Sequence, residues 1–126
     1  MERTLPLTFA SSIQTLTDLF PQSNDRTDIR EKLKEIINLK GALLRFGLSL
    51  FIRLGHKSTE AISIITNASH NMDESINSIR NFLDNHTSEC CSNETCNRSV
   101  DKAFFEIEMA FNICMIDLPD AIYKGI

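Results

Sequence analysis

Apolar side chains recur at intervals of three and four residues along most of this chain, and that spacing places them on one face of an α-helix. The pattern predicts helices over residues 9–20, 25–54, 59–83 and 99–117. With 4 glycines and 3 prolines in 126 residues, the chain has little of the turn chemistry that an all-β fold needs. We therefore expect an all-α fold, a compact disulfide-bonded bundle of four to five helices, with a single domain over residues 1–126.

Helix-ending residues stand between these segments. Pro21 follows the first segment, Gly55 provides a stop for the second, and Pro119 marks the end of the last. Residues 71–74, Asn-Met-Asp-Glu, resemble an internal helix cap. Such a cap would divide the third helix into two.

The stretch from Gly41 to Gly55 is unusually apolar, because its only polar side chains are Arg45, Ser49 and Arg53. A helix of this kind is either buried around most of its girth or carries an exposed apolar face. Gly41 and Gly47 either let another helix come close or kink this one. We expect burial, with these side chains mostly in the core: Leu43, Leu44, Leu48, Phe51 and Ile52. An open groove lined by them would instead favour carriage of an apolar ligand.

Cysteines and glycosylation sequons gather in one polar stretch near residue 90. Three of the four cysteines lie there, namely Cys90, Cys91 and Cys96. Four Asn-x-Ser/Thr sequons occur, at Asn67, Asn85, Asn93 and Asn97. A chain of this composition would give about two sequons by chance, and neither sequons nor an even cysteine count serve a protein of the cytosol. We therefore expect a secreted glycoprotein with disulfide bonds.

Charge and hydropathy are consistent with a secreted protein. Residues 1–9 are too short and too interrupted for a signal peptide, so we expect a mature secreted chain behind an added initiator methionine. The most apolar run, over residues 43–54, is cut by charged side chains, and we expect no membrane partner. The net charge of −4 gives no reason to expect nucleic acid. We expect a monomer.

The four cysteines allow three pairings. A bridge between the adjacent Cys90 and Cys91 would be strained. With a last helix continuous from Ser99, Cys114 lies about 22 Å along it and out of reach of Cys96. This leaves Cys96 bonded to Cys90 or Cys91, and the remaining one of these two bonded to Cys114. The spacing does not fit a metal site, which favours C-x-x-C pairs or nearby histidines.

No catalytic constellation is visible in the sequence, and we expect neither an enzyme nor a cofactor. The three histidines, His56, His70 and His86, lie far apart and are interpreted as surface residues. Basic side chains on the second helix alternate with acidic ones, which is typical of a solvated face. From that face we select three residues as candidates for contact with a partner: Arg26, Arg30 and Lys34.

A short all-helical chain with late-clustered cysteines between Cys90 and Cys114 and several sequons resembles the anopheline mosquito salivary inhibitors, the family that includes albicin and anophensin. The resemblance implies a non-enzymatic salivary effector at a host–parasite interface. It would inhibit a host plasma cascade by protein–protein binding, chiefly the alternative complement pathway, with contact activation as a second target. The implied partner is a host plasma protein complex, with components of the complement convertase as the candidates.

Two other classes of small secreted helical protein remain open. Carriers of apolar ligands, such as insect odorant-binding proteins, are similar in size and helicity, but their cysteines are spread over several helices, whereas all four here follow residue 89. A helical cytokine is the third possibility. A hydrophobic groove would favour the carrier over the effector.

Overall fold

The computed structural model describes residues 7–20, 29–85 and 94–126 and shows an all-helical fold. Its elements are α1 (Leu7–Asp18), α2 (Ile29–Leu54), the short 3₁₀ turn η2 (Gly55–Ser58), α3 (Thr59–Asn85) and α4 (Glu94–Lys124). These described residues form no strand, so the all-α prediction is confirmed.

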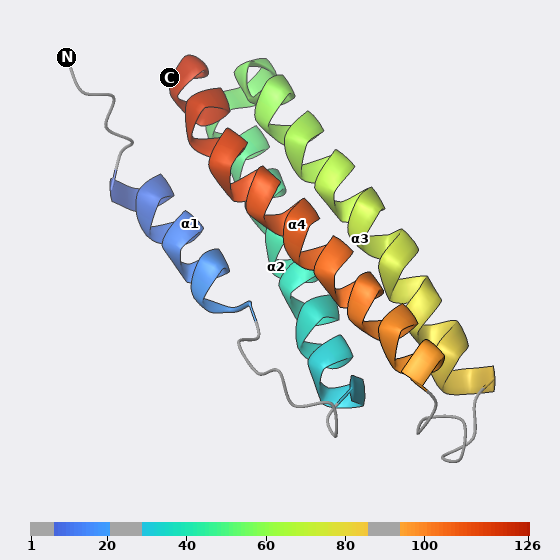
Figure 1. Cartoon of the computed structure of the whole chain (residues 1–126). Helices are drawn as coiled ribbons and strands as arrows, with labels where there is room; N and C mark the ends of the chain where they lie inside the picture. The colour runs from blue at the N-terminus through green and yellow to red at the C-terminus, as the bar shows by residue number, and fades with distance from the viewer. Residues whose placement is uncertain (1–6, 21–28, 86–93) are drawn as a thin grey trace.

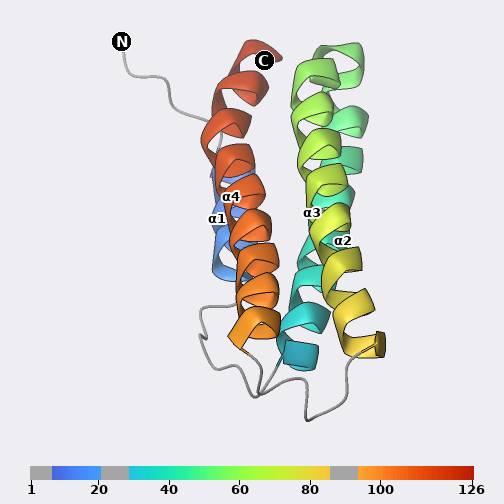
Figure 2. The same ribbon diagram turned by 45° about the vertical axis from the view of Figure 1, so that its right-hand side comes forward.

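The helices alternate in direction and form a bundle in which α3 lies alongside α4 (Figure 1). The backbone of α3 packs against both α2 and α4, and α1 packs against the same two helices from the other side. Between the described parts of α2 and α4 there is no close backbone approach, and the same holds for α1 and α3. Each of these pairs therefore lies diagonally across the bundle, as the turned view also shows (Figure 2).

Two clusters of buried apolar side chains fill the bundle. One joins α1 to the other three helices, and the other joins α2, α3 and α4 near the start of α2. Phe20, just past α1, packs against both clusters and stacks on Phe111 with ring centroids 5.3 Å apart. Because burying a large apolar side chain contributes about 1.5–3 kcal/mol, this packing is the main source of stability.

The third helix does not break. α3 runs without interruption through residues 71–74, so the division predicted there is wrong. Met72 is fully buried, Asp73 pairs with Lys40 of α2, and the buried hydroxyl of Ser75 donates to Glu106 Oε2 at 3.2 Å. These tertiary contacts hold the segment in a helix, whatever its local preference for a cap.

The last helix is longer than expected at both ends. It begins at Glu94 instead of Ser99 and ends at Lys124, with Pro119 inside it, so the prediction that Pro119 ends it is wrong. A proline inside a helix costs about 3 kcal/mol, because it removes a hydrogen bond and crowds the preceding turn. Leu118, Ala121 and Ile122 are all buried, and their burial offsets that cost.

Glycines act where the chain turns or where helices approach. Gly55 ends α2 as predicted, with a φ of +58° that other residues adopt with strain. Gly47 is buried against Ile65 of α3, whose Cδ1 lies 3.5 Å from the position of a Cβ. A Cβ at this position would make ordinary van der Waals contact with Ile65, so the approach of α3 does not require glycine there.

Cys114 is a free thiol in the core, and the bridge expected there is wrong. Cys114 follows Glu94 by 20 residues, about 30 Å along one continuous helix. Cys90 and Cys91 precede Glu94 by four and three residues, so an extended chain carries them at most about 14 Å from it. Neither reaches the separation of about 7 Å or less between Cα atoms that a disulfide needs.

Burial, together with the nearby carboxylate of Asp117, raises the pKa of Cys114 to about 12. Between about pH 9 and pH 12 the unfolded chain loses a thiol proton that the folded chain keeps, so stability falls as pH rises through that window. We expect this thiol to lower the free energy of unfolding by about 1 kcal/mol per pH unit there. Urea unfolding at several pH values, in reductant, measures the slope.

The matched control for this prediction is Cys114→Ala. Every other titratable group is common to the two chains, so the difference in slope reports Cys114 alone. Equal slopes for the two chains would contradict the prediction.

Candidate protein-binding surface

The outer side of α2 carries four large apolar side chains in solvent. Leu44, Leu48, Phe51 and Ile52 are 40%, 65%, 57% and 81% exposed, whereas Leu43 is fully buried. The prediction that this group lies in the core is therefore right for Leu43 and wrong for the other four. The apolar half of α2 has neighbours on only two sides, α1 and α3, and no described helix covers the third.

These four side chains form one ridge. Their spacing of four, seven and eight residues places them on a single face of the helix. The same face continues through the half-buried Ile37 towards Arg30, over about 33 Å of helix. We call the exposed surface formed by Leu44, Leu48, Phe51 and Ile52 the α2 ridge. It is the convex side of one helix, which suits contact with another protein surface better than enclosure of a small ligand.

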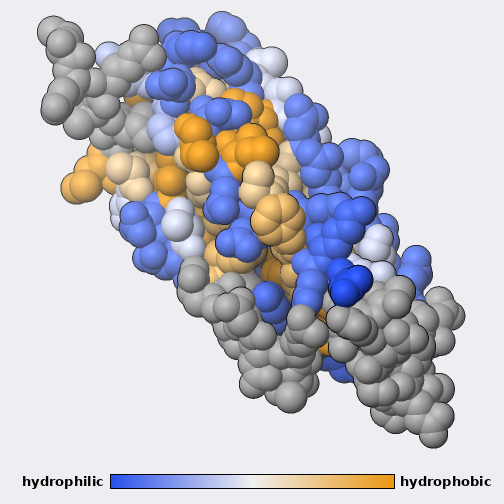
Figure 3. Space-filling view, in the orientation of Figure 1, coloured by the Kyte–Doolittle hydropathy of each residue, from blue (hydrophilic) through white to orange (hydrophobic). Residues whose placement is uncertain are grey.

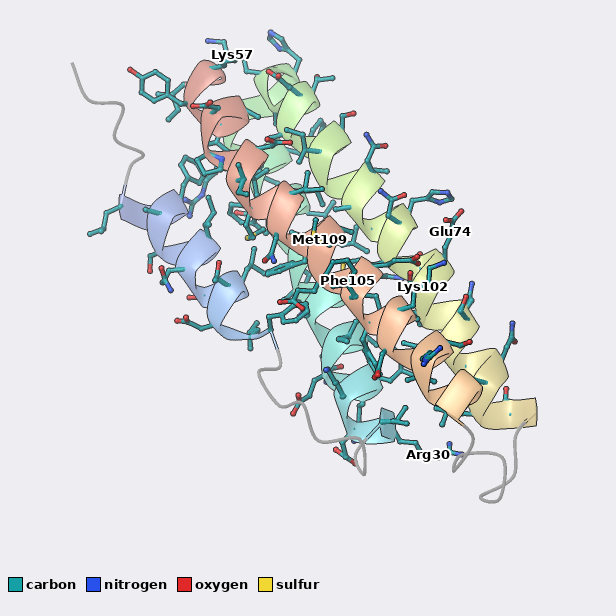
Figure 4. The ribbon with its side chains drawn as sticks, in the orientation of Figure 1. Arg30, Lys57, Glu74, Lys102, Phe105 and Met109 are labelled. Atoms are coloured by element: carbon teal, nitrogen blue, oxygen red, sulfur yellow. The ribbon has the colours of Figure 1, made fainter. Side chains whose placement is uncertain are left out.

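The charged side chains on the part of the chain that carries the α2 ridge are all basic. The sequence holds no aspartate or glutamate between Glu35 and Glu60. Lys40 is neutralised by Asp73, and the guanidinium of Arg53 lies over the ring of Phe9, 5.5 Å from its centroid. Lys57, labelled in Figure 4, is exposed at the end of the bundle beyond the ridge. The ridge is therefore apolar with a positive border.

A basic hollow of about 280 Å³ lies at the other end of α2, between α2 and α3. Its apolar floor comes from Leu33, Ile37 and Leu83. Its charged wall consists of Arg30, Lys34, Arg80 and Asp84. A groove with an apolar floor and three cationic side chains suits an acidic segment of a partner.

The hollow contains two of the three basic residues selected from the sequence. Arg30 and Lys34 lie together as expected (Arg30 is labelled in Figure 4), while Arg26 lies outside the described residues. Sequence reasoning missed Arg80 of α3. The turn at Gly55 could have indicated Arg80. Two antiparallel helices joined at that turn bring Lys34 beside Arg80 and Lys40 beside Asp73.

The sequons and remaining cysteines are placed only in part. Cys90, Cys91 and Asn93 lie outside the described residues. Asn85 is the last residue of α3, and Cys96 and Asn97 lie in the first turn of α4, at the end of the bundle where α2 begins (Figure 1). The fourth sequon differs, because Asn67 is exposed in the middle of α3 while Ser69 is buried. Occupancy of all four stays a prediction.

The described part of the chain holds no group of three metal-binding side chains. His56 and His70 are exposed, as expected, and His86 lies outside the described residues. In residues 7–20, 29–85 and 94–126, no helix has the length and hydropathy to cross a membrane. No protein-family profile, curated protein or solved structure matches this chain.

The exposure of the α2 ridge predicts a sharp contrast between two leucines on α2. Leu48→Ala should change the free energy of unfolding by less than about 0.5 kcal/mol, because surface substitutions rarely cost more. Leu43→Ala should cost about 2–5 kcal/mol, because it removes fully buried atoms and leaves a cavity. Chemical denaturation of the two variants measures both values. A cost for Leu48→Ala equal to that of Leu43→Ala would show that the ridge is covered.

Proposed function

We propose that this protein is a secreted, non-enzymatic effector that binds another protein along the outer face of α2 and so inhibits a host plasma cascade. The observation that carries the proposal is the α2 ridge, four neighbouring apolar side chains that are 40% to 81% exposed. Soluble proteins leave such contiguous apolar surface in solvent mainly where a partner covers it.

The ridge and the basic hollow suit one extended contact. Specific interfaces bury about 800 Å² on each partner and have an apolar centre with a polar rim. The outer face of α2 supplies the apolar centre at Leu48 and Phe51, and its basic border supplies the rim. A partner with an apolar groove and an acidic edge is complementary to both features, in the manner of other helix-in-groove contacts.

The choice of target rests on the resemblance to the anopheline salivary inhibitors. It favours components of the alternative-pathway complement convertase, with contact activation as the second cascade. Because the mechanism is occupation of a surface, inhibition should be stoichiometric and should saturate near the concentration of the target. The carrier alternative requires a groove that encloses a ligand, and the side chains expected to line it stand on a convex face instead.

The first test of this function disrupts the centre of the ridge. Leu48→Glu with Ile52→Glu should weaken inhibition of alternative-pathway haemolysis at least 30-fold, the effect of losing a hot spot of about 2 kcal/mol. Thr66→Glu, an exposed substitution on α3, is the matched control and should inhibit normally. Absence of inhibition by the unmodified protein in both complement and contact-activation assays would overturn the proposed function. Fatty acid recovered from the native protein would support the carrier instead.

The second test reverses the charge of the basic hollow. The double variant Arg30→Glu, Arg80→Glu should slow association with the target more than it speeds dissociation, because exposed charges steer encounters. The slowing should fade at high salt, where such charges are screened. Surface plasmon resonance with immobilised target measures both rates. An effect confined to the dissociation rate would contradict a steering role.

A disulfide within the stretch around residue 90 remains part of the proposal. With Cys114 excluded, Cys96 can pair with Cys90 or Cys91, which leaves one of those two without a partner in the chain. We expect non-reducing peptide mapping to find Cys96 in a bridge, and alkylation to modify Cys114 only after denaturation. Rapid alkylation of Cys96 in the native, unreduced protein would contradict the bridge.

A further inference from the structure

The short helix α1 is held to the bundle along a single apolar line. Of its 12 residues only Phe9 and Leu16 are buried. Ile13, which lies between them, and Phe20, just past the end of the helix, are partly buried against the same core. The other side chains of α1 are mostly polar and exposed, and Figure 3 shows hydrophilic surface on this side of the bundle. The attachment of α1 therefore depends on the burial of four side chains.

The polar side chains of α1 do not fasten it to a neighbouring helix. Their hydrogen bonds all end within α1, and the acceptors are Thr8 O for Ser12, Ser11 O for Thr15, Ile13 O for Thr17 and Asp18 Oδ1 for Gln14. Among the described residues, the one charged contact between α1 and the rest of the bundle is the guanidinium of Arg53 over the ring of Phe9. No hydrogen bond or ion pair of these side chains has to break when α1 leaves the bundle.

The sequence of α1 gives it little stability as a separate helix. Five of its 12 residues are serine or threonine, whose side chains favour competing backbone conformations. Its first turn holds no acidic residue and its last turn no basic one, and Asp18 places a negative charge at the negative end of the helix dipole. Isolated helices shorter than about 12–15 residues are marginal in water. The helical state of α1 therefore depends on its docking.

Beneath α1 lies an apolar groove between α2 and α4. The described parts of these two helices do not approach each other closely, and α1 packs against both. The core cluster that contains Phe9 and Leu16 includes buried side chains from each wall of the groove, namely Leu39, Phe46 and Leu50 of α2 and Phe111, Leu118 and Ile122 of α4. The packing of α3 and a second buried cluster, to which α1 contributes no residue, join the other three helices independently.

We propose that α1 is a detachable strap, which opens from the groove between α2 and α4 while those two helices and α3 stay folded. Proteins open in cooperative units, and a unit with few buried apolar contacts opens more often than the core. The closed form covers the groove, and the open form exposes its apolar walls. The strap thus controls access to this surface. The proposal does not rest on inhibition of a plasma cascade, since every readout below concerns the protein alone.

Native-state hydrogen exchange of the full chain, followed by NMR at low urea concentrations, tests the proposal. Amides of residues 12–18 should exchange at least about 100-fold faster than those of residues 65–79 in the middle of α3. Their exchange should also depend less on urea, because opening of α1 exposes less surface than global unfolding does. Equal rates and equal urea dependence in the two helices would show that α1 opens only with the whole bundle, which would overturn the inference.

Two leucine variants separate local from global opening. Leu16→Ala weakens the docking of α1 and should speed exchange of its amides at least about 10-fold. Leu33→Ala, the same substitution at a buried position of α2 in the second cluster, is the matched control. It should speed exchange in α3 and leave exchange in α1 unchanged, because it destabilises the closed and open forms equally. Equal acceleration of both helices by Leu33→Ala would contradict a separate opening of α1.

A proline substitution tests the open form directly. Thr15→Pro should unfold α1 alone, because proline inside a helix removes a hydrogen bond and crowds the preceding turn. Circular dichroism should show the loss of about one short helix, the rest should still unfold cooperatively, and fluorescence of an apolar dye should rise as it enters the groove. Thr66→Pro, the same substitution at an exposed position of α3, should unfold the whole bundle. Global unfolding by Thr15→Pro, or no rise in dye fluorescence, would overturn the inference.

Discussion

The rest of the structure depends on the packing of α3 against α2 on one side and α4 on the other. The described parts of α2 and α4 make no close backbone contact with each other, so α3 holds both in place. Along the length of α3, fully buried side chains such as Ile65, Met72 and Ile79 hold the two neighbouring helices in place. Because interiors pack densely, a change of one methylene at these positions affects both neighbouring helices.

The short first helix decides how much of the other helices is covered. α1 has 12 residues against 26 in α2 and 31 in α4, and it fills part of the groove between them. Among the described residues, the outer sides of α2 and α4 have no further helix beside them. The α2 ridge lies on the side of α2 that no described helix covers, so the arrangement that builds the core also leaves this apolar surface exposed.

The α2 ridge and the basic hollow place an apolar and a cationic surface along one helix. The basic hollow lies at the other end of α2 from the ridge, where it extends the same contact.

The sequence by itself determined the helical class and several local features. Apolar spacing located all four helices, Gly55 ended α2 with its positive φ, and the charges of Arg30 and Lys34 marked a basic surface. These features depend on side-chain periodicity or on the conformational freedom of single residues. Both are local properties that a sequence shows directly.

Only the tertiary structure decided which apolar side chains are covered. Leu43 and Leu44 are adjacent leucines in the same apolar stretch of α2. Leu43 is nevertheless fully buried and Leu44 is 40% exposed, because burial depends on where the neighbouring helices lie. Three other features have the same origin, namely the inclusion of Pro119 in α4, the uninterrupted α3 and the approach of Arg80 to Lys34. Each results from contacts between segments distant in sequence, whose packing energy outweighs the local preferences that the sequence displays.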